Sequence, residues 1–321
     1  MNDDLTLAGL GEFAVIDQLV AGHTQPPVVM VGPGDDGAVL ECADGRTVIS
    51  TDMLVQDRHF RLDWSNAHDI GRKAIAQNAA DIEAMGAAAT AFVVAFGAPA
   101  DTPAASAVEL SGGMWAEAAA IGAGIVGGDL VAAPQWVISV TALGDLGGRA
   151  PVLMSGARCG DVVAVIGDLG ASAAGYWLWH NDIPNSGSDM ELAWLRRRHL
   201  LPAVPYGQGR VAAEAGASAM TDVSDGLLAD LGHLAAASGV AIDLSTAALA
   251  PDRAALSSAA ARAGSDALDW VLTGGEDHAL VATFASAPPA RWRVIGRVGA
   301  GNGVTVDGAP RQGPSGWQSY Q

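Results

Sequence analysis

The chain has 321 residues and a mass of 32.4 kDa, and half of its residues are apolar, so it is long enough for two domains that each bury a core. Its 17 basic and 35 acidic residues give a formal charge of -18, and no basic stripe offsets it, which argues against nucleic acid as a partner. The one basic run, Arg196 to Arg198, follows a predicted helix and is interpreted as a solvated helix end.

The two cysteines, Cys42 and Cys159, form neither a CxxC metal motif nor a disulfide framework, which favours a reducing compartment. Both are expected to be inert core residues. The acidic first residues and the shortness of the most apolar stretch, residues 87–96, argue against secretion and membrane insertion. The predicted location is therefore the cytoplasm.

The first predicted strands alternate with glycine turns. A strand over residues 28–31 precedes the turn Gly34-Asp35-Asp36, and a second strand over residues 47–50 leads into Thr51-Asp52. The second strand is expected to end at Ser50-Thr51-Asp52. Three oxygen-bearing side chains would then stand at its tip.

A helix is predicted over residues 68–85, because apolar residues recur there at helical spacing. Gly86 is the expected stop. Asn78 and Asp81 are three residues apart and share one face of this helix.

The remainder of the first domain alternates strands with a helix. Strands are predicted over residues 92–96 and 136–140, with a helix over residues 103–121. The Gly127-Gly128-Asp129 sequence falls between that helix and the last strand. These elements predict an α/β domain over residues 1–147.

A second domain is predicted over residues 148–321. The glycine-rich and proline-containing segment 147–151 is the candidate boundary, and a strand over residues 162–166 begins the new unit.

The segment around residue 222 has the sharpest local pattern in the second domain. A short strand leads into Asp222, and apolar residues recur at helical spacing from Leu227 onward. Ser224 is the expected N-cap of that helix, and Asp225 is expected in its first turn. A capping role alone is as well supported as a ligand role at these two residues.

Six acidic clusters, each beside glycine or a hydroxyl residue, are spread over most of the chain. They are Gly34-Asp35-Asp36, Ser50-Thr51-Asp52, Asn78-Ala79-Ala80-Asp81, Gly127-Gly128-Asp129, Asp222-Val223-Ser224-Asp225-Gly226 and Gly274-Gly275-Glu276-Asp277. One cluster alone is more often an ordinary turn. Crowded carboxylates are costly unless cations neutralise them, and hard oxygen ligands suit Mg²⁺, so the six together predict a multi-metal phosphate site.

The predicted metal site draws on both domains. Asp36, Asp52, Asp81 and Asp129 are expected to converge within the first domain, where several Mg²⁺ ions would bridge polyphosphate oxygens. Asp222 belongs to the second domain, so the expected place of the site is a cleft between the two.

Other nucleotide-binding motifs are excluded. Two strings match G-x-G-x-x-G, at residues 32–37 and 122–127, but neither opens a helix directly after a strand. The sole lysine, Lys73, lies outside any Walker A sequence. Metal ions and backbone amides would therefore have to hold the phosphates of a bound nucleotide.

Histidine gives a weaker signal. His59 follows the Ser50-Thr51-Asp52 cluster closely enough to reach a ligand there, although a surface histidine is the commoner case. His278 follows Glu276-Asp277 and is expected in a strand. No order of serine, cysteine, histidine and aspartate supports covalent catalysis.

In this order, the clusters resemble the thiamine-monophosphate kinase family, part of the superfamily that includes aminoimidazole ribonucleotide synthetase and selenophosphate synthetase. The resemblance covers nearly the whole chain, from Gly11-Glu12-Phe13 to Gly274-Gly275-Glu276-Asp277, and passes through Lys73-Ala74 and Ser155-Gly156-Ala157. It implies a two-domain aminoimidazole ribonucleotide synthetase-like fold. An N-terminal α/β domain would pair its sheet across a homodimer to form a barrel, and an α+β domain would follow.

The resemblance implies that ATP and thiamine monophosphate give ADP and thiamine diphosphate, with several Mg²⁺ ions and an open question about a monovalent cation. The implied metal ligands are Asp36, Ser50, Thr51, Asp52, Asp81, Asp129, Asp222 and Asp225. The implied ATP contacts are Gly128, Asp129, Ser224 and Arg149, and the implied substrate contacts are His59, Glu276 and Trp317. A direct in-line transfer without a phosphoenzyme is expected.

Two positions depart from the family pattern. Met154 stands where the family has an arginine that contacts ATP, so that contact is lost or passes to Arg149 or Arg158. The segment 202–206 replaces a Pro-x-Pro-Arg sequence. The alternatives are another ATP-dependent synthetase of the superfamily and a non-catalytic Mg²⁺-nucleotide-binding regulator.

Overall fold

The computed structural model describes residues 6–10, 12–33, 38–184 and 189–317, so the turn Gly34-Asp35-Asp36 lies outside the described residues. The chain folds into two compact units. One consists of Met1–Ile82 and Ala88–Gly148, and the other of Glu83–Ala87 and Arg149–Gln321. The short segment 83–87 thus joins the second unit, which the sequence pattern did not indicate.

The first unit is built on a four-stranded sheet with the order β3-β6-β4-β5. The strands are β3 (Val48–Val55), β6 (Val137–Asp145), β4 (Ala88–Ala98) and β5 (Gly124–Ala132). Neighbouring strands are antiparallel except β4 and β5, which are parallel and are joined by helix α4 (Ala104–Ala120). Strands β3 and β5 are therefore the two edges.

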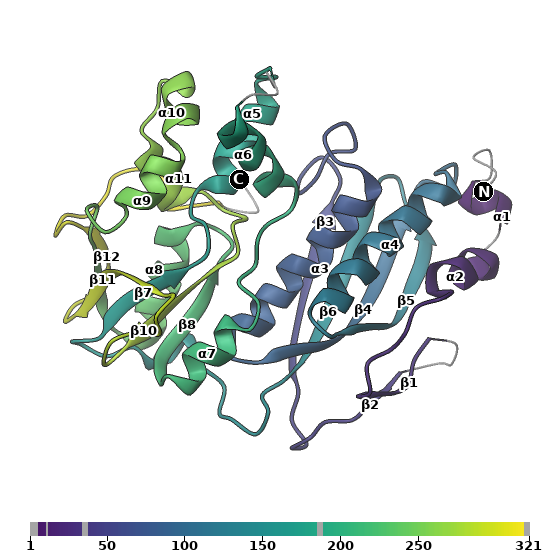
Figure 1. The fold of residues 1–321 in the computed structure, drawn as a ribbon, viewed down its shortest axis with the longest axis horizontal. Coiled ribbons are helices and arrows are strands. Elements are labelled where there is room, and N and C mark those ends of the chain that lie inside the picture. The colour runs from purple at the N-terminus through teal and green to yellow at the C-terminus, as the bar shows by residue number, and fades with distance from the viewer. Residues whose placement is uncertain (1–5, 11, 34–37, 185–188, 318–321) are drawn as a thin grey trace. The chain divides into compact units, whose positions relative to one another are not determined.

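Helices α3 (Ala67–Ala84) and α4 lie over one face of this sheet (Figure 1). Two glycines allow the helices to touch through their backbones. A Cβ atom on Gly71 would lie 2.0 Å from the Leu110 carbonyl oxygen, and one on Gly113 would lie 1.9 Å from the His68 carbonyl oxygen. This close packing fixes α3, which carries Asn78 and Asp81, against α4.

The opposite face of the sheet exposes apolar side chains. Ile49 and Met53 of β3, Val93 of β4 and Val131 of β5 are all exposed, and the strand register places them on the face that α3 and α4 leave uncovered. Exposed apolar side chains gathered on one face of a sheet are typical of an interaction surface.

The N-terminal segments complete the first unit. Helices α1 (Leu7–Leu10) and α2 (Glu12–Val20) precede a separate two-stranded sheet of β1 (Val29–Val31) and β2 (Val39–Leu40). The Leu19 carbonyl oxygen at the end of α2 accepts hydrogen bonds from Ser111 Oγ and Trp115 Nε1 of α4.

The second unit is built on a six-stranded sheet with the order β12-β9-β11-β7-β10-β8. The strands are β7 (Val162–Ile166), β8 (Ala217–Val223), β9 (Ala241–Leu244), β10 (Ala279–Phe284), β11 (Arg293–Gly299) and β12 (Gly303–Val306). All neighbours are antiparallel except β9 and β12. The predicted strand over residues 162–166 is confirmed.

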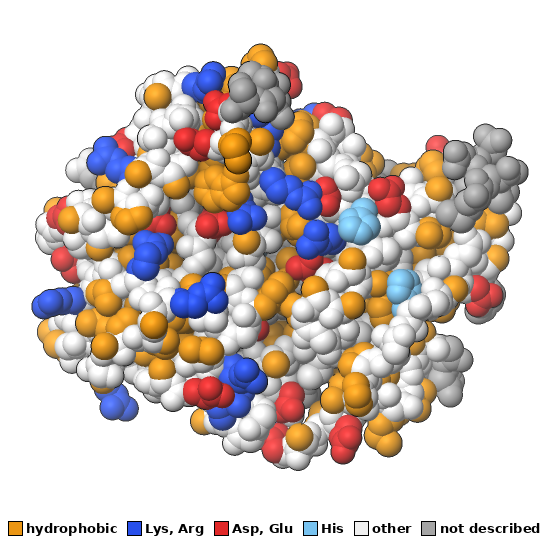
Figure 2. Space-filling model, in the orientation of Figure 1, with side chains coloured by type: hydrophobic (Ala, Val, Ile, Leu, Met, Phe, Trp, Pro, Cys, Tyr) orange, Lys and Arg blue, Asp and Glu red, His pale blue; other side chains and the backbone are white. Residues whose placement is uncertain are grey.

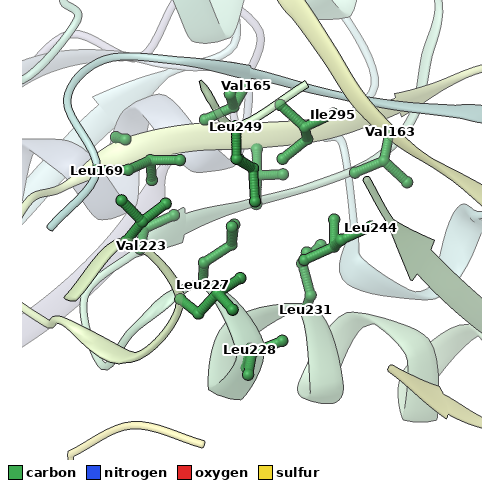
Figure 3. Close-up of a cluster of buried hydrophobic side chains, with 14 of the residues drawn as sticks. Val163, Val165, Leu169, Val223, Leu227, Leu228, Leu231, Leu244, Leu249 and Ile295 are labelled. Carbon is green, nitrogen blue, oxygen red and sulfur yellow. The ribbon is translucent and has the colours of Figure 1, made fainter. Parts of the chain in front are cut away.

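Seven helices and one 3-10 turn are described in the second unit besides the end of α3. They are the turn η1 (Met154–Gly156), α5 (Ala171–His180), α6 (Met190–Leu200), α7 (Gln208–Glu214), α8 (Leu227–Ser238), α9 (Ala250–Ala255), α10 (Ser257–Ala263) and α11 (Ala267–Thr273). Figure 3 shows Leu227, Leu228 and Leu231 of α8 within a buried cluster that also contains Val223 at the end of β8. This core anchors the loop between Val223 and Leu227 at both of its ends.

Three sequence-based expectations are wrong. Cys42 and Cys159 are exposed and do not belong to a core, so their thiols contribute no packing. Strand β3 continues to Val55 and does not end at Asp52, because its ladder with β6 extends over all eight residues. The Gly127-Gly128-Asp129 sequence lies within β5, an edge strand that the glycines concealed.

The distribution of basic side chains on the drawn face (Figure 2) agrees with the lack of a basic stripe in the sequence. On the face drawn in Figure 2, basic side chains occur singly or in small groups among acidic and uncharged ones. Within the described ranges, no helix is both long enough and apolar enough to cross a bilayer.

Candidate functional site

The first group of candidate residues lies where β3 faces helix α3. Side chains alternate along a strand, so Ser50 and Asp52 both point to the helix-covered face. Ser50 Oγ donates a hydrogen bond of 2.7 Å to Asp81 Oδ2. The structure therefore brings Ser50 and Asp81, 31 residues apart in the sequence, into direct contact.

Asp52 is held in place by α3. The Asn78 side-chain oxygen accepts a hydrogen bond of 3.0 Å from the Asp52 backbone N–H, and Gln77 Nε2 donates to Asp52 Oδ2 over 3.4 Å. Asn78 is buried, and its own amide donates to the Ala74 carbonyl oxygen at 2.8 Å. The predicted shared face of Asn78 and Asp81 is confirmed, and we call Ser50, Asp52, Asn78 and Asp81 the strand-helix cluster.

Thr51 does not belong to the strand-helix cluster. It lies on the opposite face of β3, where its hydroxyl donates to the Val140 carbonyl oxygen at 3.0 Å and accepts from Thr141 Oγ1 at 3.1 Å. The prediction of three oxygen groups at one strand tip is wrong, because β3 remains extended and successive side chains point to opposite faces.

Asp129 is also remote from the strand-helix cluster within one chain. The ladder aligns Met53, Ser139, Ala95 and Asp129 across the sheet, so Asp129 lies on the uncovered face of the far edge strand. Three strand spacings separate the two edges by about 14 Å. The expected convergence of Asp129 with Asp52 and Asp81 therefore does not occur within a single chain.

Gly128 is packed too closely to accept a side chain. A Cβ atom there would lie 2.0 Å from the Val94 carbonyl oxygen. The glycine before Asp129 is thus required by the packing of β5 on β4, in addition to any contact with a ligand.

His59 follows β3 in a tight loop. The His59 Nδ1 atom accepts a hydrogen bond of 3.0 Å from the Val55 backbone N–H. The backbone N–H of His59 donates to the Val55 carbonyl oxygen at 3.0 Å. A ring nitrogen that accepts a hydrogen bond carries no proton, so the proton of the neutral imidazole resides on Nε2.

The second group of candidate residues lies in two loops of the second unit, residues 222–226 and 274–278, which we call the paired loops. The Glu276 N–H donates to the Ser224 carbonyl oxygen at 2.7 Å, and the His278 N–H donates to the Val223 carbonyl oxygen at 2.9 Å. The Trp317 N–H donates to the Asp225 carbonyl oxygen at 2.9 Å. The structure thus brings together Asp225, Glu276 and Trp317, three residues predicted from distant parts of the sequence.

Asp230 organises the first of the paired loops. Its Oδ2 atom accepts hydrogen bonds from the N–H groups of Asp225, at 3.1 Å, and Gly226, at 3.0 Å. Burial, together with the charges of Asp222 and Asp225, raises the pKa of Asp230 to about 7. The N-cap role predicted for Ser224 is wrong, because Gly226 is the N-cap of α8 and Asp225 precedes the helix.

The second of the paired loops has an unusual backbone. Glu276 and His278 have φ angles of 62° and 53°, a left-handed conformation that glycine adopts far more readily. Such positions persist in proteins mainly where the side chain is needed, because each costs about 1 kcal/mol or more. We therefore regard Glu276 and His278 as functional candidates on geometric grounds.

Two side chains of this loop are anchored to other parts of the second unit. Asp277 is buried, and its carboxylate accepts hydrogen bonds from the backbone N–H groups of Gly170 and Ser172 at the start of α5. Burial outweighs these two hydrogen bonds and raises the pKa of Asp277 to about 7. His278 Nδ1 lies 3.0 Å from Asp222 Oδ2, in a buried contact.

Glu276 is accompanied by two residues that the sequence reasoning missed. His199 Nδ1 lies 3.7 Å from Glu276 Oε2 and 3.2 Å from Ser172 Oγ. The sequence pattern placed the end of a helix before Arg196, whereas α6 continues to Leu200 and carries His199 in its last turn. Spacing alone does not connect it with residue 276.

The predicted ATP contact Arg149 is engaged within the second unit. Its Nη2 atom donates to the Gly86 carbonyl oxygen at 3.5 Å, and Nη1 lies 3.7 Å from Glu214 Oε1. Met154, where the family pattern has an arginine, is 44% exposed in the η1 turn. Replacing Met154 would therefore not disturb a buried core.

A pocket of about 510 Å³ adjoins the paired loops. Asp225 and Trp317 line one part of it, and Leu228 and His233 of α8 line another. Its size suits a small organic molecule, and it combines an indole ring with a carboxylate.

The candidate ligand residues do not form a closed metal cage. Among the described residues, no three histidine, cysteine, aspartate or glutamate side chains lie close enough to hold a metal ion on their own. Mg²⁺ commonly binds through one or two carboxylates together with substrate phosphates. The oxygen atoms of Ser50 and Asp81, with those of Asp52 nearby, are therefore suitable ligands for this ion.

Two family descriptions match the chain. The N-terminal domain of AIR synthase related protein matches residues 34–146, and the C-terminal domain matches residues 158–308. The thiamine-monophosphate kinase of Mycobacterium tuberculosis is 66% identical over 98% of this chain and 93% of its own length. The chain belongs to the thiamine-monophosphate kinase family.

Further comparisons agree with this family. The thiamine-monophosphate kinase of Corynebacterium glutamicum is 43% identical over 100% of this chain and 96% of its own length. The solved AaThiL complex with AMPPCP and TMP superposes with a TM-score of 0.79 at 29% identity and covers 98% of this chain and 99% of that one. The predicted two-domain aminoimidazole ribonucleotide synthetase-like fold is confirmed.

Proposed function

We propose that this protein transfers a phosphate group from ATP to thiamine monophosphate, giving ADP and thiamine diphosphate. The observation that carries the proposal is the strand-helix cluster, which presents oxygen ligands in a chain 66% identical to a thiamine-monophosphate kinase. The AaThiL complex was solved with AMPPCP and TMP bound. Substrates of the same kind are proposed for this chain.

The reaction needs alignment of the reactants more than it needs a strong base. The second pKa of a phosphate monoester is near 6, so the attacking oxygen is already largely deprotonated at neutral pH. Bound Mg²⁺ would shield the negative charge of the two reacting phosphates. The chain's own residues would supply oxygen ligands and fix the orientation of the acceptor, and the transfer would be direct and in-line.

The residue roles follow the family resemblance. The proposed Mg²⁺ ligands are Asp36, Ser50, Thr51, Asp52, Asp81, Asp129, Asp222 and Asp225. The proposed ATP contacts are Gly128, Asp129, Ser224 and Arg149, and the proposed contacts to thiamine monophosphate are His59, Glu276 and Trp317. The strained backbone of Glu276 and the pocket beside Trp317 support the last group.

The position of Asp129 favours a homodimer in which each site uses both copies. Within one chain, Asp52 and Asp129 occupy opposite edges and opposite faces of the sheet. A second copy that covers the apolar face with Ile49, Met53, Val93 and Val131 would close a barrel. Its far edge would then bring the partner subunit's Asp129 towards β3.

Subunit mixing tests this arrangement. Asp52→Asn and Asp129→Asn proteins should each be inactive, and a co-refolded mixture should recover about a quarter of wild-type activity, since half of the dimers are mixed and one of their two sites is intact. A mixture as inactive as its components would show that each site takes both residues from one chain.

The catalytic proposal is tested by measuring ADP formation with and without thiamine monophosphate. The kinase should form ADP only when thiamine monophosphate is present, and thiamine diphosphate should appear in equal amount. ADP formation that ignores this substrate would favour another ATP-dependent synthetase, and no ADP under any condition would favour a regulator. Isolation of a phosphorylated residue during turnover would contradict direct transfer.

A further inference from the structure

The sole lysine of the chain is buried in the first unit. Lys73 lies in α3 with only 2% of its surface exposed, between residues that pack against the sheet. Its Nζ atom donates a hydrogen bond of 2.7 Å to the His59 carbonyl oxygen. Burying an ammonium group is costly, so a long apolar side chain would fill the same space at lower cost.

The loop that receives this hydrogen bond has a constrained conformation. Asp57 has a φ angle of 64°, and its N–H donates to the Phe60 carbonyl oxygen at 2.7 Å. The ring and the backbone N–H of His59 both form hydrogen bonds with Val55, the last residue of β3. Lys73 therefore fixes the carbonyl of a residue whose ring is already fixed by the strand.

These two anchors act on different groups of the same histidine, its ring and its backbone carbonyl. The Val55 N–H selects the imidazole form that carries its proton on Nε2. Lys73 holds the peptide that sets where this Nε2–H points. An N–H donor in a fixed position suits an acceptor such as a phosphate oxygen of the substrate.

We propose that Lys73 is a positioning residue for thiamine monophosphate, acting through His59. This inference rests on the proposed function, in which His59 contacts that substrate. In this proposal Lys73 acts through the His59 peptide and not by contact with the substrate. Its role is to keep the His59 loop in the conformation that binds the acceptor.

The test compares Lys73→Met with the matched control Arg72→Met. Arg72 is the preceding residue of the same helix, and its guanidinium pairs with Glu117 at 2.8 Å, away from the His59 loop. Lys73→Met should raise the KM for thiamine monophosphate by about 10-fold, the equivalent of one lost hydrogen bond to a charged group. The KM for ATP should change by less than about 2-fold. Arg72→Met should leave both KM values near those of the wild type.

A second measurement separates this inference from the proposed function. Nitrogen NMR of the His59 ring, assigned with a His59→Gln variant, reports its protonation form in the protein without substrates. The wild type should show a protonated Nε2 and an unprotonated Nδ1, and Lys73→Met should show a mixture of the two neutral forms. Because the NMR measurement needs no substrate, it tests the effect of Lys73 on His59 even if the wild type does not use thiamine monophosphate.

Two results would overturn the inference. One is a Lys73→Met protein with wild-type His59 signals and a wild-type KM for thiamine monophosphate. The other is a lower melting temperature with both KM values unchanged, which would make Lys73 a purely structural residue. If Lys73→Met does not fold, Lys73→Arg keeps the charge but moves the donors, and it should show the same selective rise in KM. An unchanged KM in that folded variant would also overturn the inference.

Discussion

The strand-helix cluster of the first unit and the paired loops of the second unit use carboxylates in different ways. Ser50, Asp52 and Asp81 project from a regular strand and helix and are half-buried. In the second unit, Asp277 of the paired loops and Asp230 of α8 are buried, and both accept hydrogen bonds from backbone N–H groups. We propose that the first region offers oxygen atoms to a ligand, whereas in the second region the most buried carboxylates fix the backbone.

This contrast predicts opposite consequences for mutations in the two regions. Removing a carboxylate from the strand-helix cluster should affect catalysis and leave stability nearly unchanged. Removing one of the buried carboxylates from the paired loops should affect stability first. Each prediction below tests one side of the comparison.

The largest expected effect is on activity. Asp52→Asn and Asp81→Asn each replace an anionic oxygen ligand with a neutral one, so kcat/KM should fall by about 10²–10³-fold or more. The melting temperature should shift by less than about 2 °C, because both side chains are only half-buried. Steady-state kinetics and thermal unfolding measure the two quantities.

Asp101→Asn is the matched control for these variants. Asp101 is an exposed aspartate of the same unit, outside the cluster. It should keep wild-type activity. A similar loss of activity in Asp101→Asn, or a large loss of stability in Asp52→Asn, would contradict the division of roles between the two regions.

The sequence predicted the main strands and helices of the first unit but not the strand that carries Asp129. Apolar spacing indicated α3 and α4 to within one or two residues, because each helix buries a single face against the sheet. Strand β5 was missed since its glycines resemble a loop, and Gly128 is there for close strand packing. Composition cannot distinguish these two uses of glycine.

The candidate site shows a similar limit. The pairing of Ser50 with Asp81 depends on how α3 lies on β3, and the roles of Asp230 and His199 depend on contacts made by loops and helix ends. Local spacing carries no information about such long-range contacts. The acidic clusters themselves were recognisable because crowded carboxylates need a cation or an N–H partner wherever they lie.

The next largest effect is expected on stability. Asp277→Asn keeps one acceptor oxygen but places an amide group against the second backbone N–H at the start of α5. The free energy of unfolding should fall by about 1–3 kcal/mol, measured by urea denaturation. Ser265→Ala, at an exposed position of the same unit, is a suitable control and should change it by less than about 0.5 kcal/mol.

Asp277 should also make stability depend on pH. Its pKa is raised by burial to about 7 in the folded protein, compared with about 4 in the unfolded chain. The folded state therefore binds the proton more tightly, and the contribution is complete below pH 4 and is lost as the pH rises towards 7. Between pH 5 and 7 the wild type should lose stability relative to Asp277→Asn. Parallel pH profiles for the two proteins would contradict this assignment.

The smallest expected effect separates stability from function at a single residue. Glu276 adopts a left-handed backbone conformation that costs a residue with a side chain about 1 kcal/mol relative to glycine. Glu276→Gly should therefore raise the free energy of unfolding by up to about 1 kcal/mol and also raise the KM for thiamine monophosphate. Glu276→Gln keeps the strain and should raise the KM without the gain in stability. If Glu276→Gly is less stable than the wild type, the contact with His199 stabilises the loop by more than the strain costs. Glu276 would then stabilise the folded protein, as Asp277 is expected to do.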